Sequence, residues 1–170
     1  LTRLSAAERN PMRTSSFGTG QLMLAAAEAG AKRIMLGLGG SATTDGGGGI
    51  ALALGIQFFD TEGKEFASFT GADLGRVHRI DAAQRQLRNV EIVICRDVDN
   101  PLTGPDGAAA IYGPQKGATP EQVNLLDQGL SQLGRLWLEQ FGVDVRMQAG
   151  AGAAVQGAQG GTGLLRLCHG

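Results

Sequence analysis

The chain has 170 residues and a formal net charge of −1, from 15 basic and 16 acidic residues. This length suffices for one domain with its own core, so we predict a single domain over residues 1–170. Because there is neither a basic block nor an acidic tail, the charge balance argues against nucleic acid and membrane lipid as partners and favours a small ligand. No apolar run approaches the length of a membrane span, and no signal-peptide pattern opens the chain. We therefore expect a soluble protein that is not exported.

The cysteine and glycine contents narrow the class further. Cys95 and Cys168 lie far apart, without the spacing of a metal knuckle or a disulfide framework, which favours a reducing cytoplasm. Glycine accounts for 28 residues, more than twice the usual share of about 7%. The glycines cluster in short loops between apolar segments, so we expect loops with a function rather than low complexity.

The first half of the chain alternates helix and strand signals. Residues 19–29 are rich in helix formers and are followed by a glycine, which predicts a helix. The short apolar run 33–38 predicts a buried strand, and the glycine-rich residues 39–49 then form a loop before a helix that begins at Ile50. A hairpin is expected from residues 57–59, the glycine-containing polar turn 60–64 and the residues after it.

The second half contains the clearest strand and the clearest helix. Residues 90–95 are β-branched and predict a strand, and a Thr-x-x-Gln capping box with proline at the first helical position predicts a helix over 119–141. A short strand is expected at 143–145. Residues 150–170 are rich in glycine and alanine and are either a phosphate loop or a frayed, disordered end.

These elements predict an α/β fold with a mainly parallel sheet. The expected strands lie near Ile34, Ile92 and Phe58, and the expected flanking helices are residues 19–29 and 119–141. Strand, glycine loop and helix in this order present free backbone N–H groups to an anion.

The glycine loop is the first candidate site. It has no Walker A spacing, yet its glycines allow close backbone approach, and Ser41, Thr43 and Thr44 add hydroxyl donors. The spacing alone does not distinguish an anion-binding site from an ordinary glycine-rich turn. A carboxylate repels phosphate, so Asp45 would have to bind magnesium, accept a proton or bond a substrate hydroxyl.

Acidic residues at the end of strand 90–95 form the second candidate. Asp97, Asp99 and Asn100 offer hard oxygen ligands suited to magnesium with nucleotide phosphates. The alternative is an Asx turn that ends the strand.

Lys116, in a glycine-flanked loop before a helix, is the third candidate. It is placed to contact phosphate as a point charge, although most exposed lysines make no specific contact. No catalytic triad and no histidine or cysteine cluster is legible, which excludes acyl transfer and zinc chemistry.

Three segments in order resemble one family, the bacterial-type glycerate kinases. They are TSSFGTGQL at residues 14–22, LGLGGSATTDGGGG at 36–49 and CRDVDNPLTGPDGAAAIYGPQKGAT at 95–119. The resemblance extends over residues 6–152. It implies one domain of a two-domain cytoplasmic kinase that uses ATP and Mg²⁺ to phosphorylate D-glycerate, most often to 2-phosphoglycerate.

The resemblance also suggests roles for particular residues. Asp45, Asp97 and Lys116 would be catalytic, and Asp97 and Asp99 would hold the metal. The residues expected to bind substrate or nucleotide are Gly39, Gly40, Ser41, Thr43, Gly46, Gly47, Gly48, Asn100 and Gln115.

The chain also departs from the family pattern. Thr44 occupies a position where the family pattern usually has asparagine, and Arg96 lies between Cys95 and Asp97. The last glycine loop of the pattern is interrupted after Ala154. Family members are more than twice as long, so we expect an interior fragment that is inactive alone and whose partner is the missing domain of the same enzyme. The alternatives are a non-catalytic nucleotide- or anion-binding remnant, a degenerate product without a ligand, and transfer to the 3-hydroxyl.

Overall fold

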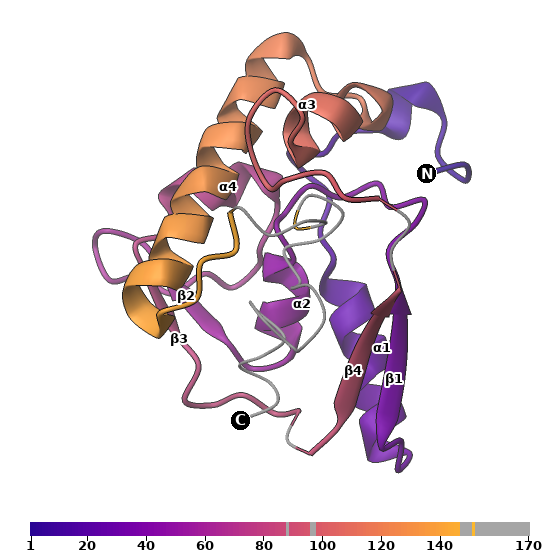
Figure 1. Cartoon of the computed structure of the whole chain (residues 1–170), viewed down its shortest axis with the longest axis vertical. Coiled ribbons are helices and arrows are strands. Elements are labelled where there is room, and N and C mark those ends of the chain that lie inside the picture. Colours follow the sequence, from indigo (N-terminus) through magenta and orange to yellow (C-terminus); the bar gives the residue numbers. More distant parts are fainter. Residues whose placement is uncertain (88, 96–97, 147–150, 152–170) are drawn as a thin grey trace.

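The computed structural model describes residues 1–87, 89–95, 98–146 and 151 as a mixed α/β structure (Figure 1). Its helices and strands in chain order are α1 (Phe17–Glu28), β1 (Arg33–Gly37), α2 (Gly48–Ala53), β2 (Gln57–Phe59), β3 (Arg79–Asp81), β4 (Glu91–Cys95), α3 (Ala108–Tyr112) and α4 (Pro120–Phe141). Three short 3-10 helices accompany them, namely η1 (Ala6–Glu8), η2 (Gly71–Arg76) and η3 (Pro114–Lys116). No helix in the described part of the chain is long and apolar enough to cross a membrane.

The described strands form two separate pairs. β1 and β4 are parallel, with Ile34 opposite Ile92, which confirms the two strands predicted there. β2 and β3 are antiparallel, with Phe58 opposite Ile80, so the prediction that Phe58 belongs to the parallel sheet is wrong. The predicted hairpin is confirmed in part. After the turn the chain returns antiparallel to β2, with a bridge between Phe59 and Glu65 and a hydrogen bond from the Phe66 N–H to the Phe58 carbonyl oxygen, but these residues do not form a second strand.

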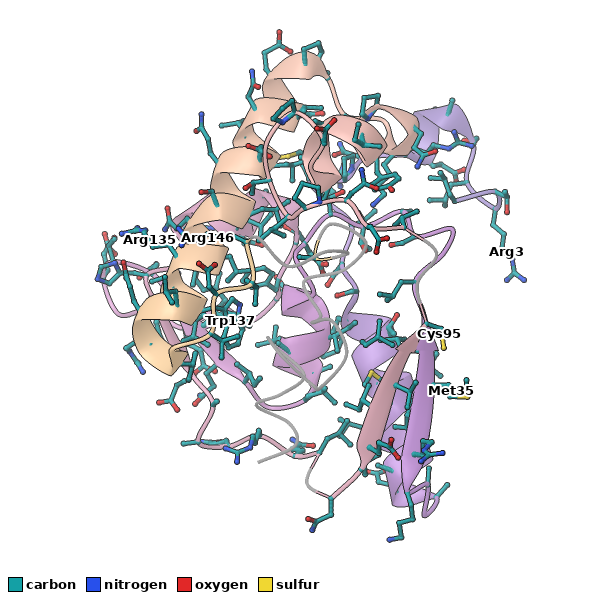
Figure 2. The ribbon with its side chains drawn as sticks, in the orientation of Figure 1. Arg3, Met35, Cys95, Arg135, Trp137 and Arg146 are labelled. Atoms are coloured by element: carbon teal, nitrogen blue, oxygen red, sulfur yellow. The ribbon has the colours of Figure 1, made fainter. Side chains whose placement is uncertain are left out.

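The parallel pair is half covered. Ile34 and Leu36 pack against the core, whereas Met35 between them is 70% exposed. Figure 2 shows Met35 and Cys95 directed away from the body of the molecule. The expectation of a fully buried β1 is therefore wrong, since the strand alternates in burial as the strand period of two requires.

Helix α4 forms as its capping box predicts. The Thr119 side chain accepts a hydrogen bond from the Gln122 backbone N–H, and Pro120 occupies the first helical position. Its inner face buries Leu126, Leu130, Leu133 and Trp137 in the core, which is the stripe expected of an amphipathic helix. The helix ends at Gly142 in a left-handed conformation, and the strand predicted at 143–145 does not form.

Helix α2 lies at the centre and contacts α1 (Figure 1). The two helices approach so closely at Gly20 that a β-carbon there would lie 2.6 Å from Ala53 Cβ and 2.8 Å from the Ile50 carbonyl oxygen. Of the predicted tail, residues 150 and 152–170 lie outside the described residues, and Ala151 is buried.

The contact between α1 and α2 leads to a stability prediction. Gly20→Ala is expected to destabilise the fold by about 1–3 kcal/mol, because neither the Ala53 methyl group nor the α2 backbone is a flexible neighbour. Gly18→Ala, two residues earlier in the same helix, has no atom within 4 Å of its new methyl group and should be neutral or stabilising by less than about 1 kcal/mol. Urea unfolding of both variants measures the difference, and equal stabilities would contradict the close approach.

Candidate functional site

A cavity of about 350 Å³ lies where the end of β1, the glycine loop 38–47, the start of α1 and the segment around η3 meet. Of the predicted site residues it is lined by Gly39, Ser41, Thr43, Asp45, Gly46, Gly47 and Lys116. Its other lining residues include the hydroxyl-bearing Ser15, Ser16, Thr19 and Thr44. The cavity thus joins side chains that lie far apart in the sequence.

Asp45 is buried beside this cavity, and its carboxylate accepts four hydrogen bonds. Oδ2 accepts hydrogen bonds from the Ser16 backbone N–H at 2.7 Å, the Ser16 hydroxyl at 2.8 Å and the Gly49 N–H at 3.2 Å. Oδ1 accepts one from the Gly47 N–H at 3.1 Å. The side chain is 2% exposed, so these donors replace the water that an anion would otherwise bind.

Ser16 is a residue that sequence reasoning missed. Besides donating to Asp45, its hydroxyl oxygen accepts a hydrogen bond from the Ile50 N–H at 3.0 Å. Ser16 thereby connects the first turn of α1 to both the carboxylate and helix α2. Its signal was the TSSFGTGQL segment, which carried the family resemblance without a role for any of its residues.

Lys116 reaches the cavity from η3. Its ammonium group donates to the Thr43 carbonyl oxygen at 2.6 Å and lies 3.5 Å from Thr44 Oγ1. Burial lowers the pKa of Lys116 to about 8, and the negative charge of Asp45 partly opposes this shift. Tyr112 packs nearby, with its ring centroid 6.0 Å from the ammonium nitrogen.

The glycines of the loop divide into two groups. Gly46 and Gly48 are packing positions, because a β-carbon on Gly46 would lie 2.8 Å from Leu133 Cδ2 and one on Gly48 would lie 2.2 Å from the Phe69 ring. Gly39 and Gly40 are exposed, with no atom within 4 Å of such a carbon. The exposed pair leaves room for a ligand, whereas Gly48 is buried against the core.

The other predicted residues in the described part of the chain do not line the cavity; they are Gly40, Gly48, Asn100, Gln115 and Asp99. Asn100 Nδ2 donates to the Asp106 carbonyl oxygen at 2.9 Å, and Asn100 Oδ1 accepts from the Tyr112 hydroxyl at 2.5 Å. Its amide therefore holds the loop before α3. Gln115 and Asp99 are exposed, and Asp97 lies outside the described residues.

No group of three or more histidine, cysteine, aspartate or glutamate side chains that could hold a metal ion occurs among the described residues. Three hydrogen bonds occupy Asp45 Oδ2, so only Oδ1, which accepts one, keeps capacity for a further partner. Asp99 is a carboxylate on the surface, a donor type that Mg²⁺ accepts alongside phosphate oxygens.

The bonds of Ser16 predict a stability effect. Ser16→Ala removes one donor from a buried carboxylate and one acceptor from the Ile50 N–H, so the free energy of unfolding should fall by about 1–3 kcal/mol. The matched control is Ser131→Ala at an exposed position of α4, expected to change stability by less than about 0.5 kcal/mol. Denaturant unfolding tests both, and a Ser16 variant as stable as the control would contradict the network.

Lys116 predicts a pH dependence of stability. Between pH 8 and about 10.5 the unfolded chain keeps the Lys116 proton and the folded chain loses it, so the unfolded state binds more protons and stability rises with pH. The free energy of unfolding of the wild type minus that of Lys116→Met should therefore increase across this window. Lys64→Met, at an exposed site, controls for the loss of a lysine charge. A difference that stays flat from pH 8 to 10.5 would show that the ammonium is not desolvated.

Comparison with known proteins identifies the family. The model of the Glycerate kinase family matches residues 1–169. Glycerate kinase of Haemophilus influenzae is 48% identical over 162 residues, which cover 94% of this chain and 42% of the relative. Glycerate 2-kinase of Escherichia coli is 42% identical over 156 residues, which cover 91% of this chain and 41% of the relative.

A solved structure agrees with these sequence matches. The crystal structure of a protein from Salmonella typhimurium LT2, described as a candidate glycerate kinase 2, superposes with a TM-score of 0.86 at 43% identity and covers 91% of this chain and 41% of that chain. The chain thus spans about two fifths of the length of these relatives. Because the family model matches almost every residue, the chain belongs to the glycerate kinase family of phosphotransferases.

Proposed function

We propose that this chain is part of an enzyme that transfers the γ-phosphoryl group of ATP to the 2-hydroxyl of D-glycerate, with the rest of the family's length completing the enzyme. The observation that carries the proposal is the cavity. Each of the three segments that resemble glycerate kinases supplies it with a residue, namely Ser16, Asp45 and Lys116. The name of the Escherichia coli relative, glycerate 2-kinase, favours the 2-hydroxyl over the 3-hydroxyl.

Phosphoryl transfer requires the enzyme to position the reactants and neutralise their negative charge, and it requires no covalent intermediate with the protein. The bond between the β,γ-bridging oxygen and the γ-phosphorus breaks, a new bond forms from the glycerate oxygen to that phosphorus, and the hydroxyl proton is released; the products are ADP and phosphoglycerate. Lys116 is suited to stabilise the negative charge of the reactants, because its ammonium group lines the cavity within a partly desolvated site.

Asp45 suits a positioning role. Three of its four hydrogen bonds fall on Oδ2, which leaves that oxygen no lone pair for a substrate proton. Oδ1 accepts one bond and retains capacity to orient a substrate hydroxyl. We therefore assign Asp45 to holding the glycine loop and orienting the acceptor, in preference to general-base catalysis.

Magnesium belongs to the proposal as the ion that accompanies ATP. When bound, it would neutralise phosphate charge during transfer. The proposed ligands are the carboxylates of Asp97 and Asp99, which follow β4, together with the nucleotide's own phosphate oxygens. Gly39, Gly40 and Ser41 are proposed to present backbone and hydroxyl donors to anionic substrate groups.

A hybrid enzyme tests the proposal. The chain replaces the matched 162-residue segment of the Haemophilus influenzae enzyme, and ADP release is followed with ATP, Mg²⁺ and D-glycerate. We expect turnover by the hybrid, little or none by the isolated chain, and at least a hundredfold loss of kcat/KM in the Lys116→Met hybrid beside an unaffected Lys64→Met hybrid. Product analysis by NMR distinguishes 2- from 3-phosphoglycerate.

A second candidate function is a non-catalytic nucleotide- or anion-binding module, favoured by the structural engagement of Asp45, whose Oδ2 accepts three hydrogen bonds. It predicts a folded hybrid that binds ATP without turnover. That outcome would reject the kinase proposal.

A further inference from the structure

Residues 9–14, which we call the anchor segment, do not line the cavity, yet they contact both loops that supply its polar groups. At one end the Thr14 hydroxyl donates a hydrogen bond to the Ala42 carbonyl oxygen at 2.9 Å, within the glycine loop. At the other end Arg9 packs against the loop that carries Lys116. The anchor segment therefore connects two parts of the site that lie far apart in the sequence.

The hydrogen bond from Thr14 orients one peptide group of the glycine loop. That peptide joins Ala42 to Thr43, and its carbonyl oxygen accepts from Thr14 Oγ1 while its N–H donates to Ser41 Oγ at 3.1 Å. Because a peptide group is planar, its rotation would disturb both bonds. The two bonds thus constrain where the next carbonyl group, that of Thr43, is placed.

The Thr43 carbonyl group is the main partner of the Lys116 ammonium. Nζ donates to this oxygen at 2.6 Å, whereas its contact to Thr44 Oγ1, at 3.5 Å, is at the limit of a hydrogen bond. A lysine side chain has a flexible four-carbon stem, so its charge lies where a fixed acceptor holds it. Thr14 therefore acts on Lys116 through the carbonyl groups of two successive residues.

Arg9 holds the backbone on both sides of Lys116. Gly117 has a φ of +91°, and a β-carbon there would overlap the Arg9 carbonyl oxygen and lie 3.0 Å from Arg9 Cβ. The Arg9 guanidinium group donates to the Gln115 carbonyl oxygen at 3.4 Å. The backbone that carries Lys116 is thus packed directly against the anchor segment.

The anchor segment is itself fixed to the rest of the fold. Pro11 is buried, and the Met12 carbonyl oxygen accepts a hydrogen bond from the Ala72 N–H at 3.0 Å. Within the segment, Asn10 accepts from the Thr14 N–H at 3.2 Å through its carbonyl oxygen and from the Met12 N–H at 3.1 Å through its side chain. The Thr14 hydroxyl is therefore presented from a turn that is held in place.

From these contacts we infer that Thr14 is a positioning residue for phosphoryl transfer, whose hydroxyl holds the Ala42–Thr43 peptide so that the Thr43 carbonyl fixes the Lys116 ammonium at the cavity. Its role in the reaction rests on the proposed function, whereas its effect on Lys116 does not. Because Thr14 does not line the cavity, it acts through Lys116 rather than on the reactants.

The titration of Lys116 tests this inference in the chain itself. A trace of an amine-acylating reagent is applied from about pH 6 to about pH 11, and peptide mass spectrometry reads the modification of Lys116 and of the exposed Lys64. Burial lowers the pKa of Lys116 to about 8, so its modification should reach half of its maximum near that pH. Thr14→Val keeps the shape of the side chain and removes the donor. The released ammonium then moves into water, and the midpoint should rise by about half a pH unit or more.

Matched variants separate the hydroxyl from the rest of the side chain. Thr14→Ser keeps the hydroxyl and should keep the midpoint, and Thr61→Val makes the same change at an exposed turn. Asp45 and Tyr112, which face the ammonium, are unchanged in every variant. Circular dichroism checks folding, and Thr14→Ala replaces a valine variant that does not fold. A midpoint that stays or falls without the hydroxyl would overturn the inference, as would an equal rise in Thr14→Ser.

The hybrid enzyme tests the link to the reaction. Thr14→Val should lower kcat about tenfold, because a misplaced ammonium stabilises the transferred phosphoryl group less well. KM for ATP should change less than about twofold, and Thr14→Ser should restore kcat to within about twofold of the unsubstituted hybrid. An unchanged kcat in the valine hybrid would overturn the positioning role in catalysis. An unsubstituted hybrid without turnover would reject the kinase proposal, while the midpoint of Lys116 would still decide whether Thr14 positions the ammonium.

Discussion

The arrangement of this molecule depends on one buried carboxylate. Asp45 accepts hydrogen bonds from the starts of both α1 and α2. A buried anion that lacks such donors costs several kcal/mol, so the loop is stable only when the two helix starts lie side by side. Ser16 completes this arrangement, since its hydroxyl bonds Asp45 and the α2 backbone at the same time. The same hydrogen bonds therefore fix both the geometry of the site and the packing of the two helices.

This constraint explains why so many glycines are needed near the site. Once the helix starts are joined through Asp45, the helix axes are too close for a side chain at Gly20. Gly48 likewise allows the Phe69 ring to lie against the loop from the core side. Glycine-rich loops are easily interpreted as phosphate cradles, but here part of the glycine content permits close packing, whereas Gly37, Gly39 and Gly40 are exposed and face open space.

Local signals determined which parts of the fold were predictable. Helix α4 was predicted almost to the residue. Its signals, the capping box of Thr119 and Gln122 and the apolar stripe, come from residues that lie close together in the sequence. β2 pairs with β3, and Phe58 packs onto Phe69 with ring centroids 4.5 Å apart. Both contacts join residues distant in sequence, which no local pattern reveals. Asp45 and Lys116 were predicted as site residues from their loops, and both line the cavity. Ser16 was not predicted, because its hydrogen bonds form only when α1 reaches the glycine loop.

The electrostatics of the cavity connect folding to ligand binding. Lys116 is held by the Thr43 carbonyl oxygen, and no ion pair of the described residues joins it to Asp45. Burial without a carboxylate partner makes the charged form costly, as the lowered pKa of Lys116, about 8, expresses. Asp45 offsets this cost only in part, so an anion bound at Lys116 would add countercharge. Such binding would stabilise the folded chain by the amount that the charge of Lys116 is neutralised.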